Sequence, residues 1–259
     1  MICKTTTLVL FIIGSLLSSP TYETVKFRIT PSTTEGYLSR MEGRLKRPQG
    51  NDPFPAVVLI PGSSGICPYH YTWLERIASW GYVALLVDSI GTRQYFDPNI
   101  APFLVSLQEL VQDAYDAKTY LSGLSFVDKS RIAVMGWEEG GWAILTDIRG
   151  LMPNEQGGDS FRAAITFYPY CEGEIATTNS PLLILMGEKD RWCPPGRCWI
   201  ASERKSLPEV ILRIYPGTHH AFDAEGTDKM LKGHRLRYDP VSANDAIDRV
   251  KKFLLNHLK

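Results

Sequence analysis

Short apolar runs alternate along the chain with longer segments in which apolar residues recur at helical spacing. The six clearest runs are Ala56–Ile60, Val83–Val87, Arg131–Met135, Ala163–Tyr168, Leu182–Met186 and Val210–Tyr215. Runs without polar alternation are typical of strands buried on both faces of a sheet. Apolar residues repeat near the helical period over Leu107–Leu121 and Ile247–Leu258, which predicts helices there. Together the two patterns predict an α/β fold, with a mostly parallel central sheet and helices on both of its faces.

Two segments near the start of the chain have a more polar alternation. Val25–Thr30 and Leu38–Leu45 alternate apolar with polar residues, which is typical of strands with one solvated face. We expect them to form an antiparallel edge of the sheet. At the other end of the chain, Ser242 and Asp245 resemble a capping box that starts the last helix. No segment differs from its flanks in composition as a linker would, so residues 20–259 are predicted to form a single domain.

Residues 1–19 have the layout of a secretory signal peptide. Lys4 supplies a positive charge, Leu8–Leu17 is mainly apolar, and the small residues Ser18 and Ser19 follow it. The alternatives are a buried first strand or an uncleaved anchor. The apolar run has about ten residues, whereas a membrane-spanning helix needs about 20. We therefore expect export to the periplasm or the medium, and no membrane span once the signal has been removed.

The composition is that of a globular protein, and it excludes several classes of function. The 28 basic and 28 acidic residues balance, which argues against nucleic-acid binding. Hydrophobic residues make up 44% of the chain, which is enough to form a core and argues against disorder. The GWEEGG segment lacks the GxGxxG spacing of a dinucleotide site, and the sequence contains no phosphate-binding loop. We expect no cofactor, and a small molecule as substrate or ligand.

Four cysteines follow the predicted signal peptide. They are Cys67, Cys171, Cys193 and Cys198. An even number of cysteines in an exported protein permits disulfides, and buried free thiols are the alternative. A metal site could combine Cys193 and Cys198 with the His219–His220 pair. The spacing of the two cysteines and the absence of a second tight pair argue against it, so we expect no metal.

Polar residues follow three of the predicted strands at the edge where α/β sheets bind ligands. The strand Arg131–Met135 runs into Gly136-Trp137-Glu138-Glu139-Gly140 and then a helix, which is the context of a nucleophile elbow. Asp190 follows Leu182–Met186, and His220 follows Val210–Tyr215. The order of elbow, acid and histidine along the chain matches the arrangement of α/β hydrolases.

Six stretches form a recognisable set: PAVVLIPGSSGICPYHYTWLERIASWGYVALLVDSIG, SFVDKSRIAVMGWEEGGWAIL, FRAAITFYPYC, PLLILMGEKDRWCPP, YPGTHHAFD and RYDPVSANDAIDRVKKFL. Together they resemble the dienelactone hydrolase family of α/β hydrolases, from about Pro55 to the C-terminus. The resemblance implies an α/β-hydrolase fold, with Asp190 as the catalytic acid. It places the catalytic histidine at His220 rather than His219. It also implies an oxyanion hole built from backbone N–H groups near Ser63 and at Glu139.

Glu138 departs from the family pattern, because it stands where members of the family carry a cysteine or serine nucleophile. A carboxylate has no proton for His220 to remove, so general-base activation of a hydroxyl does not apply. Glu138 could instead be a covalent nucleophile, the partner of His220 in a stable ion pair, or a general base that activates water. The first and third hypotheses predict a hydrolase of small esters or lactones. The second predicts a catalytically inactive protein that binds a small ligand or partner.

Aromatic residues near the strand ends predict an apolar substrate pocket formed by Tyr69, Trp137, Tyr168 and Trp192, although aromatic residues at such positions also occur in cores. Arg93 is expected on the surface, as is the side chain of Glu139 at the start of a helix.

The neighbouring strands of the resembled fold bring Cys171 towards Cys193 and Cys198. We expect a Cys171–Cys198 disulfide, which would tether the loop that carries Asp190.

Overall fold

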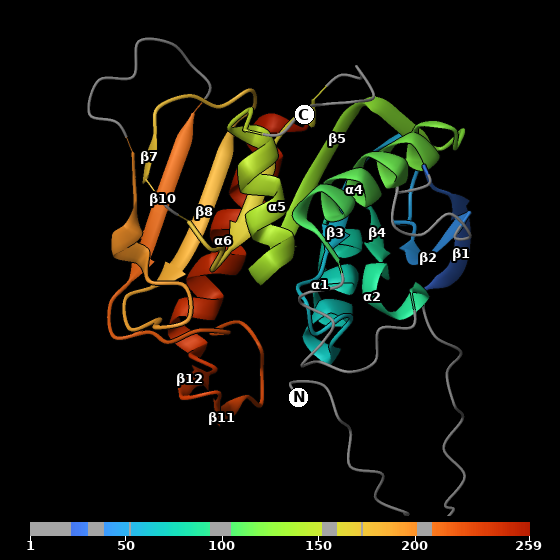
Figure 1. Cartoon of the computed structure of the whole chain (residues 1–259). Coiled ribbons are helices and arrows are strands. Elements are labelled where there is room, and N and C mark those ends of the chain that lie inside the picture. The colour runs from blue at the N-terminus through green and yellow to red at the C-terminus, as the bar shows by residue number, and fades with distance from the viewer. Residues whose placement is uncertain are drawn as a thin grey trace, which may run out of the picture.

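The computed structural model describes residues 22–30, 39–51, 53–93, 105–151, 160–171, 173–200 and 209–259. These residues form an eight-stranded sheet (Figure 1). From one edge to the other, its strands are β1 (Glu23–Arg28), β2 (Arg40–Lys46), β4 (Val83–Val87), β3 (Phe54–Ile60), β5 (Val127–Trp137), β6 (Ala164–Phe167), β8 (Leu182–Gly187) and β10 (Val210–Tyr215). β2 runs antiparallel to both of its neighbours, β1 and β4. The other six strands, β4, β3, β5, β6, β8 and β10, all run parallel.

Each of the six apolar runs coincides with a strand of this sheet, as expected, although Ala163 and Tyr168 flank β6. The two polar segments form its antiparallel edge, although residues 31–38 lie outside the described part of the chain. The predicted signal peptide, residues 1–19, also lies outside it. Alternate residues of one strand face opposite layers: Val57 and Leu59 of β3 belong to one core cluster, and Val58 and Ile60 belong to the other. The sheet is therefore buried on both faces, which explains the uninterrupted apolar runs.

Helices cover both faces of the sheet. They are α1 (Pro68–Ser79), α2 (Ser89–Thr92), α4 (Leu107–Ser122), α5 (Glu138–Ile148) and α6 (Pro240–His257). Apolar residues of α4 and α5 pack in the cluster that contains Val58, and those of α1 and α6 pack in the cluster that contains Val57. Figure 1 shows α4 and α5 in front of the sheet. The α/β prediction is confirmed. Within the described residues, no helix is long and apolar enough to cross a membrane.

The last helix begins earlier than the sequence pattern suggested. Its N-cap is Asp239, whose carboxylate accepts a hydrogen bond from the backbone N–H of Ser242 at 2.8 Å. Pro240 occupies the first helical position, where the missing N–H costs nothing. The predicted capping box of Ser242 and Asp245 is therefore wrong, because both residues already lie inside the helix.

Smaller elements follow the central strands. A three-residue strand, β7 (Gly173–Ile175), pairs with β9 (Cys198–Ile200). The short 3₁₀ helix η1 (Pro195–Arg197) directly precedes β9. The hairpin of β11 (Asp228–Leu231) and β12 (His234–Arg237) precedes α6.

A disulfide joins Cys171 to Cys198, and the predicted pairing is confirmed. It closes a segment that contains β8 and the Asp190 loop. Cys193, the alternative partner, is a buried free thiol.

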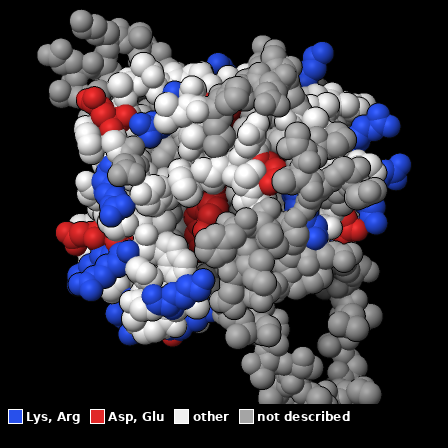
Figure 2. Space-filling model, viewed as in Figure 1, with Lys and Arg blue, Asp and Glu red and all other residues white. Residues whose placement is uncertain are grey.

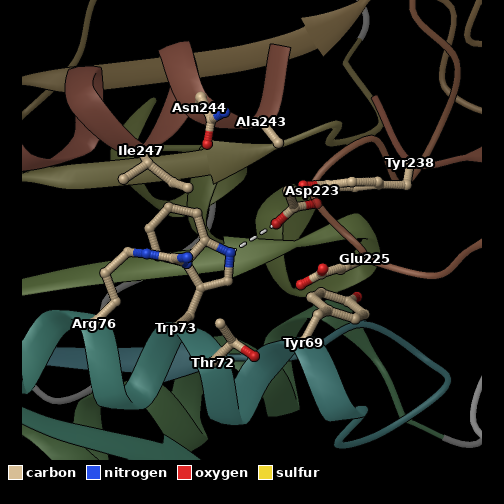
Figure 3. A pocket seen from close by; sticks show the side chains of 10 residues that line it. All are labelled: Tyr69, Thr72, Trp73, Arg76, Asp223, Glu225, Tyr238, Ala243, Asn244 and Ile247. Atoms are coloured by element: carbon tan, nitrogen blue, oxygen red, sulfur yellow. Dashed lines mark hydrogen bonds between the residues drawn. The ribbon is translucent and has the colours of Figure 1, made fainter. Parts of the chain in front are cut away.

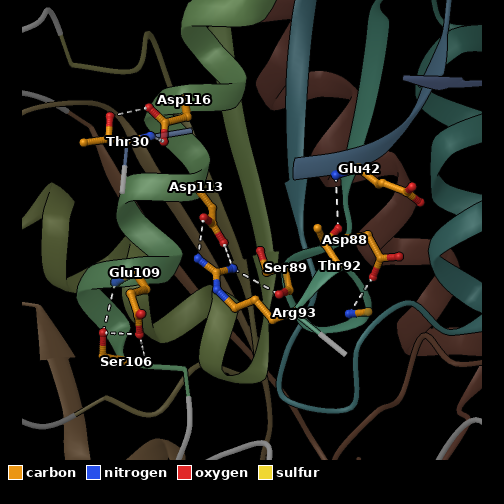
Figure 4. A network of polar contacts seen from close by, with 11 residues as sticks. Thr30, Glu42, Asp88, Ser89, Thr92, Arg93, Ser106, Glu109, Asp113 and Asp116 are labelled. Carbon is orange, nitrogen blue, oxygen red and sulfur yellow. Dashed lines mark hydrogen bonds and ion pairs between the residues drawn. The ribbon is translucent and has the colours of Figure 1, made fainter. Parts of the chain in front are cut away.

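A buried ion pair ties α2 to α4. The guanidinium of Arg93 donates to both carboxylate oxygens of Asp113, at 2.7 and 3.0 Å (Figure 4). Both side chains are almost fully buried, so the expectation of a surface position for Arg93 is wrong. The same view shows the carboxylate of Asp116 holding Thr30, next to β1, which links the edge of the sheet to α4.

Gly140 sets how closely the start of α5 approaches β3. A Cβ at this position would lie 2.3 Å from the carbonyl oxygen of Ile60 and 2.6 Å from that of Pro61. We expect Gly140→Ala to lower the free energy of unfolding by about 1–3 kcal/mol, the cost of forcing an extra methyl group into a packed region. Urea denaturation of Gly196→Ala is the control, since nothing lies within 4 Å of the Cβ position there. Equal stability of the two variants would contradict this account.

Candidate active site

Glu138 lies at the sharp junction between β5 and α5. Its φ of 51° is in the left-handed region, which is unfavourable for residues other than glycine. Gly136 and Gly140 allow the turn, because a Cβ on Gly136 would lie 2.7 Å from the backbone of Gly140. This strained strand-to-helix turn is the geometry of a nucleophile elbow. It presents Glu138 at the carboxyl end of the sheet, where the glycine pattern predicted it.

Asp190 and His220 meet Glu138 at this end of the sheet. His220 Nδ1 lies 2.7 Å from Asp190 Oδ2, and His220 Nε2 lies 3.1 Å from Glu138 Oε1. The other oxygen of Asp190 accepts hydrogen bonds from the backbone N–H groups of Trp192 and Cys193, both at 2.8 Å. These bonds fix the orientation of the Asp190 carboxylate. The three side chains proposed from the sequence therefore form one buried hydrogen-bonded chain.

The charge of His220 follows from its two partners. Burial lowers the pKa of His220, but the hydrogen bonds and charges of Asp190 and Glu138 outweigh burial and raise it to about 10. At neutral pH the ring is an imidazolium that donates one hydrogen bond to each carboxylate. In this state His220 can act as an acid, and it cannot accept a proton until it has given one away.

The side chain of Glu139 folds back over the turn, so the expectation that it points to solvent is wrong. Its Oε2 accepts a hydrogen bond from the backbone N–H of Ser63 at 3.0 Å. Burial and the charge of Glu138 raise the pKa of Glu139, while hydrogen bonds from Ser63 and from the backbone amide of Glu139 lower it. These two backbone amides are the donors that the sequence assigned to an oxyanion hole. In the structure the Ser63 amide donates to the carboxylate of Glu139, and the Glu139 amide helps to lower the pKa of that carboxylate.

A cavity of about 130 Å³ opens onto the two glutamates. The described residues that line it are Glu138, Glu139, Trp142, Tyr170, Trp192 and Cys193. On the face shown in Figure 2, acidic side chains come to the surface in a central hollow, in the region occupied by α5 in Figure 1. Burial and the charge of Asp190 raise the pKa of the Cys193 thiol, which disfavours its reactive thiolate form.

Of the four aromatic residues proposed for the pocket, Trp192 lines this cavity and the other three lie elsewhere. Trp137 and Tyr168 are fully buried beneath the site, and their polar atoms donate to a buried carboxylate. Tyr69 lines a separate cavity of about 60 Å³ between α1, α6 and the loop after His220 (Figure 3).

That buried carboxylate belongs to Asp223, which the sequence analysis did not single out. Its Oδ2 accepts hydrogen bonds from the indole N–H groups of Trp73 at 2.8 Å and Trp137 at 2.9 Å. Its Oδ1 accepts one from the hydroxyl of Tyr168 at 2.7 Å. Figure 3 shows Trp73 on α1 pointing towards Asp223. Since Asp223 is three residues after His220, this network anchors the histidine loop to α1, β5 and the end of β6.

The fold and the elbow define an α/β hydrolase. The dienelactone hydrolase family model matches residues 41–258, so the chain belongs to that family. The prediction of this family from the sequence is confirmed.

Individual relatives are more distant. The chain is 26% identical over 235 residues to a Bradyrhizobium protein described as a probable 2-oxo-3-(5-oxofuran-2-ylidene)propanoate lactonase, a match that covers 83% of this chain and 88% of that protein. It is 28% identical over 184 residues to cutinase 2 of Thermobifida cellulosilytica, a match that covers 69% of this chain and 65% of the cutinase.

Solved structures share the fold. A putative dienelactone hydrolase from Klebsiella pneumoniae superposes with a TM-score of 0.68 at 20% identity, over 90% of this chain and 99% of that one. A dienelactone hydrolase-like promiscuous phosphotriesterase, P91 from metagenomic libraries, also gives 0.68, at 18% identity over 92% of this chain and 100% of that one.

The charge of His220 can be tested by imidazole ¹⁵N NMR. We expect one ring to remain protonated until about pH 10, and another, His70, to remain neutral until about pH 3 because burial lowers its pKa. His220→Asn identifies the first signal. A His220 ring that titrates near 6.5, the ordinary value, would contradict the ion-pair geometry.

The raised pKa of His220 also predicts how the stability of the folded chain changes with pH. Because the pKa of His220 is higher in the folded chain than in the unfolded chain, its contribution is complete below about pH 6.5 and is lost as the pH rises towards about 10. The stability difference between wild type and His220→Asn, measured by urea denaturation, should therefore shrink over this interval. A difference that grows with pH would contradict the assignment.

Proposed function

We propose that the protein hydrolyses a small ester or lactone, with Glu138 as the covalent nucleophile. The observation that carries the proposal is the contact between Glu138 and the imidazolium of His220 at the elbow, next to a cavity. The lactonase and cutinase names of the relatives support an ester or lactone as the substrate class. The cavity of about 130 Å³ favours a short acyl group, since sites for drug-sized ligands usually measure roughly 300–1,000 Å³.

The first half of the proposed reaction transfers the acyl group to Glu138. A carboxylate oxygen of Glu138 attacks the substrate carbonyl carbon and forms a tetrahedral intermediate. The intermediate collapses to a mixed anhydride, and the C–O bond to the alcohol breaks. The leaving alkoxide takes the Nε2 proton of His220, which becomes neutral. For a lactone, the alcohol remains joined to the acyl group.

The second half restores the site. Neutral His220 accepts a proton from water, and the resulting hydroxide attacks the carbonyl carbon of the anhydride. The bond to Glu138 breaks, which leaves the product carboxylate, the Glu138 carboxylate and an imidazolium, with one proton released to solvent. Asp190 keeps the ring oriented and stabilises its charge in both halves.

The ion pairs also favour a second candidate function. An imidazolium held between two carboxylates is already neutralised, and the same geometry would serve a protein that binds a small ligand at the cavity without turnover.

We expect purified protein to hydrolyse some members of a panel of short-chain aryl esters and lactones. Glu138→Gln removes the nucleophilic charge, and His220→Ala removes the acid and base. Each should lower kcat by about 10²-fold or more. Glu209→Gln, at an exposed carboxylate that bonds His257, is the matched control and should retain wild-type activity.

The proposed role of Glu138 as a covalent nucleophile can be tested by trapping the acyl-enzyme. After a rapid acid quench during turnover, mass spectrometry should find the acyl mass on the peptide that contains Glu138. Turnover without this adduct, in a reaction that Glu138→Gln still abolishes, would favour general-base catalysis. A silent wild type combined with an active Glu138→Ser would contradict the hydrolase proposal and leave the binding function as the candidate.

We also propose that the chain is exported and loses residues 1–19. The Cys171–Cys198 disulfide supports an oxidising compartment. Amino-terminal sequencing of the protein recovered outside the cytoplasm should begin near residue 20. A full-length chain retained in the cytoplasm would contradict the proposal.

A further inference from the structure

The carboxylate of Glu139 accepts a hydrogen bond from one of the two backbone amides that the fold would use as an oxyanion hole. In this fold the oxyanion hole is formed by the backbone N–H of the residue after the nucleophile and by an N–H from the loop after β3. Here these groups belong to Glu139 and Ser63. The Ser63 N–H lies 3.0 Å from Glu139 Oε2, which is a normal distance for donation to an oxyanion.

The loop after β3 is shaped to receive this carboxylate. A Cβ on Gly62 would lie 3.0 Å from Glu139 Oε2 and 2.7 Å from Glu138 Oε2. A side chain at position 62 would therefore displace one or both carboxylates. Glycine leaves room for the two oxygens to lie side by side against the loop.

Burial and the charge of Glu138 raise the pKa of Glu139, while the Ser63 hydroxyl, among the neighbouring side chains, lowers it. Glu138 is negatively charged beside Glu139 and raises its pKa, and the charge of Glu139 in turn raises the pKa values of Tyr69 and Cys193. Burial and the charge of Glu138 thus disfavour negative charge at Glu139, whereas Tyr69 and Cys193 stay neutral beside it. The Ser63 backbone N–H holds the carboxylate against this repulsion at 3.0 Å, and the Ser63 hydroxyl and the Glu139 amide also lower the pKa of Glu139.

We propose that Glu139 is an intramolecular occupant of the oxyanion hole, which a substrate carbonyl oxygen or a small carboxylate anion must displace in order to bind. Glu139 is then a specificity-determining residue. It lowers kcat/KM for substrates whose other contacts are too weak to displace it, and it excludes short carboxylic acids, which are the products of ester hydrolysis. The effect on kcat/KM rests on the proposed hydrolase function, whereas the occupancy and the exclusion of acids do not.

The occupancy can be measured without turnover, by the ¹H–¹⁵N NMR signal of the Ser63 amide. Donation to a carboxylate moves an amide proton downfield. We expect the signal to move upfield in Glu139→Ala and to return downfield when sodium acetate is added, with sodium chloride at the same ionic strength as the control. Wild type and Glu139→Gln, whose amide oxygen can still accept from Ser63, should not respond to acetate.

Activity gives the second readout. We expect Glu139→Ala to raise kcat/KM for short aryl esters by about tenfold or more, the amount expected when one charge-assisted hydrogen bond no longer has to be broken. Acetate should inhibit this variant more strongly than it inhibits wild type. Glu139→Gln keeps the hole filled and should gain less than Glu139→Ala. Glu209→Ala, the loss of an exposed carboxylate elsewhere, should match wild type.

The outcomes separate the two proposals. A Ser63 signal that is the same in wild type and Glu139→Ala overturns the inference, as does a fall in kcat/KM for Glu139→Ala. If every variant is catalytically silent while the Ser63 signal responds to acetate as described, the occupancy stands and the hydrolase proposal fails. Retention of the wild-type fold by Glu139→Gln, checked by the rest of the spectrum, guards against a general structural effect.

Discussion

The site depends on a single interaction, the imidazolium of His220 held between two carboxylates. Neither carboxylate could be buried alone without a large desolvation cost, and the cation between them offsets that cost. The arrangement requires Asp190 and His220 to come from the ends of neighbouring parallel strands. It also requires Glu138 to project from a tight turn two strands away in the sheet. The buried ion pairs therefore depend on the strand order and on the turn at Glu138 together.

Much of this could be predicted from the sequence, because the relevant signals are local. A buried strand is an uninterrupted apolar run, and residues at its carboxyl end reach the binding edge whatever lies elsewhere in the chain. Asp190 and His220 were found in this way, and the glycines around Glu138 placed it. The Cys171–Cys198 pairing followed from the order of strands in the resembled fold.

The contacts that could not be predicted are hydrogen bonds between side chains and groups far away in the sequence. They depend on side-chain conformations that no local pattern encodes. Glu139 bonds to Ser63 across 76 positions, and Asp223 bonds to Trp73 across 150. The position of Glu139 at the start of a helix suggested an exposed side chain. Nothing in the HHAFD segment indicated that Asp223 would be buried and bonded to two indole N–H groups. Trp137 and Tyr168 were read as pocket residues for the same reason. Both residues do lie close to the proposed catalytic residues, as their positions at strand ends predicted. Their polar atoms, however, donate to Asp223 and do not face the cavity.

The left-handed backbone of Glu138 has a wider consequence. Its strain comes from the presence of a Cβ, and serine, cysteine and glutamate all carry one, so the turn itself hardly distinguishes among them. The cost of the conformation is met by the packing of β5 and α5, whichever of these side chains is present. Reacting groups can therefore be exchanged at this position while the backbone stays the same, and the chemistry of the fold can diverge faster than its architecture.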